Sequence, residues 1–214
     1  MSAATDSWAA ERIESWAGEV RVNLIRLVAI LGFFGYHLIN YYAVKDASVA
    51  SAYHTAVTVL VLAWSSAVIL LHIALTQRYD PAWLKYAATI WDAIMITSLL
   101  VLPGDLKTIG PRSPLVVLYF LLIAAAPLRL SLRLVYVATF TAMGGYLITL
   151  GHYAYVLVGY TRYYSDPAAR ISRTQEVVFL LALGAAGLLA GQVVRQMRRV
   201  MQGYPVSEAA GGGL

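Results

Sequence analysis

Six long apolar segments make up most of this 214-residue chain, and they limit its fold more than any single motif. They cover Val22–Ala43, Ala52–Thr76, Ala82–Leu102, Pro114–Leu128, Leu132–Val158 and Gln175–Val194. About 20 apolar residues suffice for a membrane-spanning helix, which satisfies its backbone hydrogen bonds internally. The sequence therefore predicts an all-α, polytopic membrane protein. We expect an N-terminal arm over 1–21, a six-helix transmembrane domain over 22–200 and a flexible C-terminal tail over 201–214.

The composition supports this class. Hydrophobic residues make up 60% of the chain and charged residues only 13%. In a soluble domain, hydrophobic residues make up about half of the chain and charged residues about a quarter. The first apolar segment is too long for a signal-peptide core and lacks a small-residue cleavage pattern after it. The absence of cysteine excludes disulfides, Fe–S clusters, Cys-ligated zinc and covalently attached c-type haem.

The distribution of Lys and Arg predicts the orientation. Ten of the 16 basic residues fall on the side that receives both termini, and six fall on the other side. By the positive-inside rule, both termini are expected in the cytoplasm of a bacterial cell, with the domain in its inner membrane. The basic residues sit at helix ends, so we read the net charge of +5 as a topology signal and expect no nucleic-acid partner.

Three of the four histidines are expected in the outer half of the bundle. At about 1.5 Å per helical residue, His37 and His152 lie about two turns below the outer surface, and His54 lies at the outer end of the second helix. These depths suggest a b-type haem with His37 and His152 as axial ligands, or a metal site that adds His54. The alternative, which the sequence favours, is a set of interfacial histidines hydrogen-bonded among neighbouring tyrosines.

A polar stripe is predicted along the second helix. His54 and His72 are eighteen residues apart, which is about five helical turns, and Thr58 and Ser65 lie on the same stripe. Because polar side chains are costly against lipid, we expect this stripe to face the interior of the bundle.

Asp92 lies near the middle of the third predicted span, where an ionised carboxylate must be paired or protonated. It is a candidate proton-, cation- or ligand-sensitive site. Alternatively it makes a structural contact with Ser65, Ser66, Thr97 or a tyrosine. The basic residues near inner helix ends are interpreted as headgroup anchors or topology signals, namely Arg26, Lys85, Arg129 and Arg133.

Small residues mark helix contacts on the last span. Gly184, Gly187 and Gly191 permit close approach, and the last two have GxxxG spacing, which indicates either an intramolecular contact or a homodimer seam. The stretch from Gln192 to Met201 then predicts a basic amphipathic continuation of the same helix out of the membrane. Such a helix could transmit a movement to a cytoplasmic partner.

Two stretches, GPRSPLVVLYFLLIAAAPLRLSLRLVYVATF and FLLALGAAGLLAGQVVRQMRRV, carry a resemblance to a known group. They are similar to the six-helix N-terminal membrane domains of bacterial signalling proteins, which precede adenylyl or diguanylate cyclase or kinase modules. The resemblance implies a sensory domain whose last helix feeds an output module. No catalytic module follows within this chain, so we expect either an isolated membrane domain or a domain that works with a separate cytoplasmic output protein or module.

The sequence contains no phosphate loop, HExxH motif or nucleophile elbow, so we expect no catalysis. The leading hypothesis is a sensory, regulatory or scaffold domain that lies among membrane lipids and responds to an outer-face or lipophilic signal. A redox subunit that binds b-type haem or quinone through the outer histidines is the alternative. A small transporter or channel centred on Asp92 is the third.

Overall fold

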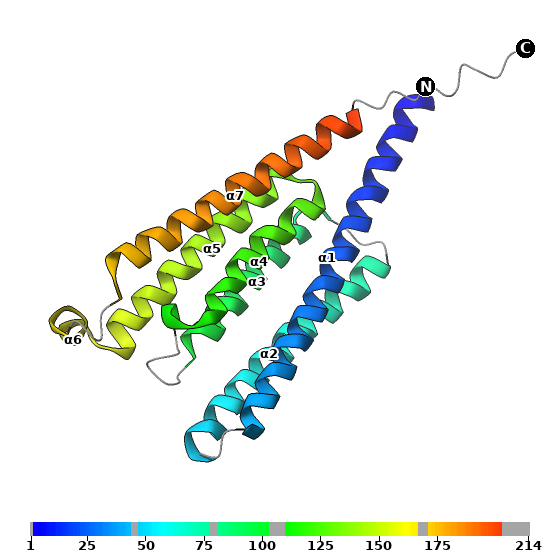
Figure 1. The fold of residues 1–214 in the computed structure, drawn as a ribbon. Helices are drawn as coiled ribbons and strands as arrows, with labels where there is room; N and C mark the ends of the chain where they lie inside the picture. The colour runs from blue at the N-terminus through cyan, green and yellow to red at the C-terminus, as the bar shows by residue number, and fades with distance from the viewer. Residues whose placement is uncertain (1, 44–46, 78–80, 103–109, 167–170, 203–214) are drawn as a thin grey trace, which may run out of the picture.

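The computed structural model describes residues 2–43, 47–77, 81–102, 110–166 and 171–202, and all regular structure in these ranges is helical. The prediction of an all-α protein is confirmed for this part of the chain. The longer helices, shown in Figure 1, are α1 (Ser2–Ala43), α2 (Ala47–Thr76), α3 (Leu84–Val101), α4 (Leu118–Ala125), α5 (Leu132–His152), α6 (Tyr160–Ser165) and α7 (Arg173–Gln202). Four short turns join them: η1 (Gly110–Arg112), η2 (Pro114–Val117), η3 (Ala126–Arg129) and the π-helical η4 (Tyr153–Leu157).

Five helical segments are long and apolar enough to cross a membrane, so five of the six predicted spans are helices of suitable length and composition. They are Trp16–Ala43, Tyr53–Thr76, Leu84–Val101, Leu132–Leu157 and Arg173–Val200. The remaining span, predicted at Pro114–Leu128, forms a shorter apolar helix over Pro114–Arg129. It consists of η2, α4 and η3 in succession, so only its middle is α-helical.

Local sequence explains where this shorter helix begins and ends. The Ser113 hydroxyl accepts a hydrogen bond from the Leu115 amide at 3.2 Å, and Pro114 occupies the first position, where its missing N–H costs nothing. At the other end, Pro127 cannot donate to an α-helical bond, and the last turn tightens to 3-10 geometry. Leu130 then reverses the chain with a left-handed φ of 51°.

The ends of the chain are more helical than the sequence suggested. α1 begins at Ser2, so the arm predicted for 1–21 and the first span form one helix. α7 runs from Arg173 to Gln202 without a break, so the helix continues past Val194, the predicted end of the last span. Nearly all of the predicted flexible tail lies in 203–214, outside the described residues.

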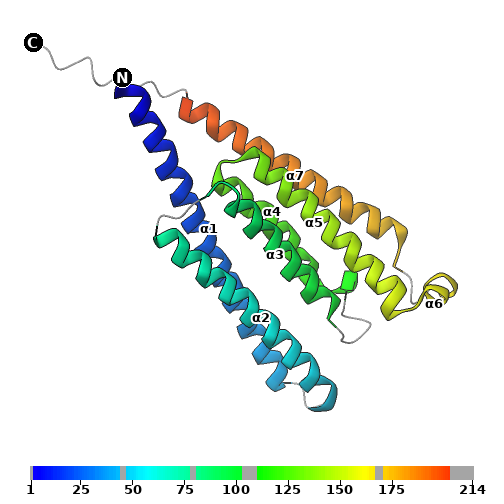
Figure 2. The ribbon, with the colours of Figure 1, turned by 180° about the vertical axis from the view of Figure 1, so that it is seen from behind.

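The helices form two groups. α1 and α2 pack together as a helical hairpin, whereas α5 is the central contact of a four-helix unit with α3, α4 and α7. In Figures 1 and 2 the hairpin lies on one side of the molecule, and α3 and α4 separate it from α5 and α7. We call the boundary between the hairpin and the four-helix unit the seam. We call the two ends of the bundle the η3 end and the α6 end.

Close packing inside the four-helix unit depends on two glycines. A Cβ atom at Gly145 of α5 would meet the Tyr119 hydroxyl at 2.8 Å, and one at Gly187 of α7 would overlap the Thr139 side chain of α5. A Cβ at Gly191 would lie 3.3 Å from Leu132, whereas one at Gly184 would meet nothing within 4 Å. The two glycines of the GxxxG motif therefore form an intramolecular contact with α5, and Gly184, predicted as a third contact, points away from it.

Candidate functional site

The seam contains a buried ion pair to which three helices contribute. Arg26 of α1 donates through its Nε to Asp92 of α3, and Trp64 Nε1 of α2 donates to the other carboxylate oxygen at 3.0 Å. Arg26 is 8% exposed and Asp92 is 5% exposed. Each charge neutralises the other, which is what makes their burial in an apolar bundle tolerable.

This arrangement corrects two expectations. Arg26 does not extend toward a headgroup; its guanidinium turns inward because Asp92 lies opposite it. The partners expected for Asp92 bond elsewhere, because the hydroxyl of Ser66 donates to the Leu62 carbonyl at 2.7 Å and that of Thr97 donates to the Ala93 carbonyl at 2.7 Å. Ser65 is only half-buried beside Trp64, and the indole takes the contact with the carboxylate.

A second buried ion pair crosses the seam toward the η3 end. Arg129 Nη2 of η3 lies 3.1 Å from Glu19 Oε2 of α1, and its Nη1 donates to the Thr89 hydroxyl at 2.8 Å and to the Lys85 carbonyl at 3.2 Å. Arg129 is thus a buried structural cation, which corrects its interpretation as a topology signal. Lys85, also expected to be an anchor, is half-buried with its ammonium 5.9 Å from the centre of the Tyr86 ring.

The hairpin is also connected internally through side chains of α1. Asn23 Nδ2 donates to the Val68 carbonyl at 3.2 Å, and Trp16 Nε1 donates to the Leu75 carbonyl at 2.8 Å. The two helices are therefore held in register by polar as well as apolar contacts.

The chain segment at η3 contacts both the hairpin and α7. Gly18 of α1 lies so close to it that an added Cβ would approach the Leu128 carbonyl to 2.9 Å. From the opposite side, Arg198 of α7 donates to the Leu130 carbonyl through Nε at 3.1 Å and through Nη2 at 2.7 Å. A displacement of α1 at the seam therefore has a direct physical route to the end of α7.

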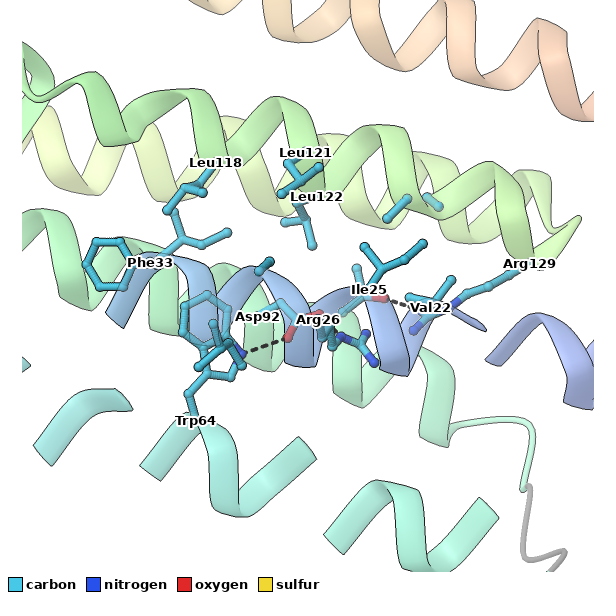
Figure 3. Close-up of a pocket in the computed structure, with 16 residues that line it drawn as sticks. Val22, Ile25, Arg26, Phe33, Trp64, Asp92, Leu118, Leu121, Leu122 and Arg129 are labelled. Carbon is cyan, nitrogen blue, oxygen red and sulfur yellow. Dashed lines mark hydrogen bonds and ion pairs between the residues drawn. The ribbon is translucent and has the colours of Figure 1, made fainter. Parts of the chain in front are cut away.

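Two apolar spaces flank the Arg26–Asp92 pair. The first, the α1–α4 cavity, has a volume of about 70 Å³ and is drawn in Figure 3, where Leu118, Leu121 and Leu122 of α4 extend toward α1 above the ion pair. The second, the α2–α3 groove, has a volume of about 380 Å³. It is lined by Arg26, Ala67, Val68, Leu70, Leu71, Ala74, Leu84, Ala87, Ala88, Trp91 and Asp92.

Hydrogen-bond capacity remains unused at the seam. Arg26 Nη1 and Asn23 Oδ1 are buried and have no hydrogen-bond partner among the described residues. A buried donor or acceptor left without a partner costs about 1–3 kcal/mol, so groups like these are normally found where a ligand or water completes them.

Two of the predicted histidine ligands are brought together, and one is not. His37 Nε2 lies 3.0 Å from His54 Nδ1, and the two rings are stacked at an interplanar angle of 12°. Tyr41 stacks on His54 with ring centroids 3.9 Å apart, and Tyr53 packs edge-on against His37. No hydrogen bond or ring contact in the described ranges joins His152 to this cluster.

This geometry bears on the predicted haem and metal sites. His37 Nε2 and His54 Nδ1 are engaged with each other in a hydrogen bond of 3.0 Å, so in this structure these two nitrogens do not point toward a common metal position. His152 lies on α5, which α3 and α4 separate from α1 in Figures 1 and 2. In the part of the chain that the structure describes, no group of three His, Asp or Glu could hold a metal ion. The haem site stays a prediction.

The polar stripe predicted on α2 does not face the bundle along its whole length. His54, Thr58 and Ser65 are half-buried, but His72 is exposed. The buried face of α2 instead carries apolar residues, namely Val57, Val61, Trp64, Val68 and Leu75. His54 and His72 can share one stripe of α2 and still differ in exposure, because the neighbouring helices cover only part of that stripe.

A smaller polar contact lies at the α6 end. Tyr163 of α6 donates its hydroxyl proton to Glu176 Oε1 of α7 at 2.7 Å. Burial and this neighbouring carboxylate raise the pKa of Tyr163 to about 12. Next to it, the Arg112 guanidinium lies 5.7 Å from the centre of the Tyr153 ring. The hydrogen bond from Tyr163 to Glu176 fixes α6 against the start of α7.

The sequence did not single out Glu19, Asn23 or Trp64, and it gave Arg129 a different role. A signal for the first two was present, since Glu19, Asn23 and Arg26 follow one another at intervals of four and three residues and so share one face of a helix. Trp64 and Arg129 carried no comparable signal, because each acts through a helix that is distant in sequence.

Comparison of the chain with protein-family models, with curated proteins and with solved structures finds no significant match to any of them.

Proposed function

We propose that this protein is a non-catalytic sensory or regulatory membrane domain in which the α1–α2 hairpin moves against the four-helix unit and α7 passes that movement on. The observation that carries the proposal is the composition of the seam. Buried ion pairs, Arg26–Asp92 and Glu19–Arg129, cross it, and apolar spaces flank the first of them.

A seam of this composition suits a two-state device. A buried ion pair is strongly destabilised when one partner is lost or engaged elsewhere, and packed interfaces move between discrete arrangements rather than continuously. A ligand that alters the Arg26–Asp92 pair would therefore change the relative stability of two hairpin positions by a large amount. The empty volume beside the pair leaves side chains room to rearrange.

The contacts of η3 support α7 as the output element. Glu19 of α1 forms an ion pair with Arg129, and Gly18 packs against the Leu128 carbonyl. Arg198 of α7 donates a hydrogen bond to the carbonyl of Leu130, the residue after Arg129. α7 then continues to Gln202 as one helix with the basic residues Arg195, Arg198 and Arg199. We propose that a cytoplasmic output protein or module responds to the position of this end.

The experiment measures distances between spin labels on the full chain in lipid nanodiscs. The chain has no cysteine, so labels can be placed singly at exposed positions, with Leu24→Cys on α1 and Val200→Cys on α7. Breaking the seam with Asp92→Asn is expected to shift this distance by about 1–2 Å or more, the size of an interhelical shift in switching proteins.

A matched label pair within the four-helix unit serves as the control. Labels at Phe140 of α5 and Leu188 of α7, both exposed, should keep the same distance in wild type and Asp92→Asn. An unchanged α1–α7 distance in both Asp92→Asn and Glu19→Gln would overturn the proposal. Changes in both label pairs would indicate general unfolding instead and would equally contradict a movement confined to the seam.

A further inference from the structure

We infer that the α2–α3 groove binds a neutral lipophilic molecule that carries a carbonyl oxygen, and that this oxygen accepts a hydrogen bond from Arg26 Nη1. The inference deepens the proposed function, on which it rests, by naming the chemical class of the signal. A membrane-soluble quinone or long-chain ketone is a molecule of this class.

The Arg26 side chain forms the polar floor of the groove. Arg26 is the only residue of α1 among the described residues that line this space; the others come from α2 and α3. Arg26 also lines the α1–α4 cavity, so its side chain lies between the two spaces. The Arg26 guanidinium is more than nine-tenths buried, and its Nη1 lacks a hydrogen-bond partner among the described residues. Arg26 Nη1 is therefore available to donate a hydrogen bond to an acceptor oxygen of a ligand.

The state of Asp92 decides which ligand oxygen fits. Both carboxylate oxygens are engaged, one by Arg26 and the other by Trp64 at 3.0 Å. The pair is already neutral as a whole, so an anionic headgroup would add a net charge to an apolar site, which is costly. A neutral carbonyl supplies the missing acceptor without that cost. The chemistry therefore favours a ketone or quinone oxygen over a carboxylate.

Depth and volume agree with this class. Asp92 lies eight residues from the start of α3, or about 12 Å along the helix, which is below the level of phospholipid headgroups. A molecule that binds there must be soluble in the hydrocarbon itself. The groove volume of about 380 Å³ lies within the range of about 300–1,000 Å³ typical of small-molecule sites. Its lining is apolar apart from the ion pair.

Binding can be measured with decyl-ubiquinone as the probe and the full chain in nanodiscs. Trp91 lines the groove and is 38% exposed, so an occupying quinone should quench its fluorescence saturably. Decylbenzene, which has a similar alkyl tail but no carbonyl, should compete at least about tenfold less well, since one hydrogen bond is worth about one factor of ten. Laurate, which adds a carboxylate, should also compete less well than the quinone.

Variants separate the groove from the fold. Ala88→Phe fills the groove one helical turn from Asp92 while both charged residues stay in place, and it should abolish saturable quenching. Ala63→Phe, on the exposed face of α2, should leave the quenching unchanged. Arg26→Lys keeps a cation opposite Asp92 but lacks the second guanidinium nitrogen, and should weaken binding about tenfold.

Three results would overturn the inference: equal competition by decylbenzene, stronger competition by laurate, or undiminished quenching in Ala88→Phe. The quenching assay can detect binding of decyl-ubiquinone even if the hairpin does not move. The spin-label distances are measured in the absence of decyl-ubiquinone. Loss of the movement would therefore refute the proposed function while a positive quenching result stood, and the reverse outcome would refute only the ligand class.

Discussion

Gly187 of α7 lies against Thr139 of α5 so closely that a Cβ atom on the glycine would overlap the threonine hydroxyl. The hydroxyl cannot easily turn away, because it donates to the Val135 carbonyl at 2.8 Å. We expect Gly187→Ala to destabilise the protein by about 1–3 kcal/mol, the usual cost of overpacking a core. Thermal unfolding in detergent measures this loss. Gly184→Ala is the control, since a Cβ there meets no atom within 4 Å; equal effects of the two substitutions would contradict the contact.

Removal of one partner from the Arg26–Asp92 pair should be far more damaging than removal of both. Asp92→Ala leaves a buried guanidinium without its counter-charge, and the expected loss is about 3–5 kcal/mol of unfolding free energy. The double variant Arg26→Met/Asp92→Leu removes both charges and should recover most of that loss.

Denaturant unfolding of the single variants Asp92→Ala and Arg26→Met and of the double variant tests this expectation. Arg162→Ala provides the exposed comparison, because the Arg162–Asp166 pair is 3.7 Å apart with its side chains 65% and 39% exposed, and its loss should be barely measurable. A double variant as unstable as the sum of the single variants would show that the two charges act independently.

The hydroxyl of Tyr163 should ionise unusually late. Its pKa of about 12 lies above the ordinary value of 10, because the phenol is buried and donates to Glu176. A raised pKa in the folded state means that the contribution to stability is complete below pH 10 and is lost as the pH rises through about 12. The difference in tyrosinate absorbance between wild type and Tyr163→Phe isolates this one phenol, and a difference centred near pH 10 would contradict the buried contact.

Arg198 should protect the chain reversal after η3. Its guanidinium donates twice to the Leu130 carbonyl, and Leu130 holds a left-handed φ of 51° that is unfavourable for a residue with a side chain. Arg198→Gln is expected to raise amide hydrogen exchange in residues 128–134 about tenfold, since bonds to a charged group are worth about 1.5–3 kcal/mol. Arg199→Gln, one residue further along α7, keeps the charge change but not the contact. Equal exchange in the two variants would contradict the role of Arg198.

The sequence predicted well what depends on length and hydrophobicity. Five of the six apolar segments are helices of membrane-spanning length, and the continuation of the last one past Val194 is present. The α-helical length of the fourth segment was harder to predict, because both of its ends form 3-10 turns that begin with or contain a proline, Pro114 and Pro127. Such tightening depends on local geometry that hydrophobicity does not register.

The site was predicted less well, because depth does not reveal which helices are neighbours. His37, His54 and His152 were grouped by their expected depth, but only His37 and His54 lie on adjacent helices. Asp92 was recognised as a buried charge, yet its partner was not found, since Arg26 had been assigned to the headgroups by a rule that treats each basic residue separately. Pairing requires a contact 66 residues away in sequence.

That sequence separation also sets an order of events during synthesis. Arg26 is made 66 residues before Asp92, which at about 5–20 residues per second is a delay of about 3–13 s. The first hairpin therefore enters the bilayer with a cation whose counter-ion does not yet exist. Its internal bonds from Asn23 to Val68 and from Trp16 to Leu75 are complete as soon as α2 emerges. We expect the nascent hairpin to wait at the insertion machinery, sheltered from lipid, until α3 delivers the aspartate.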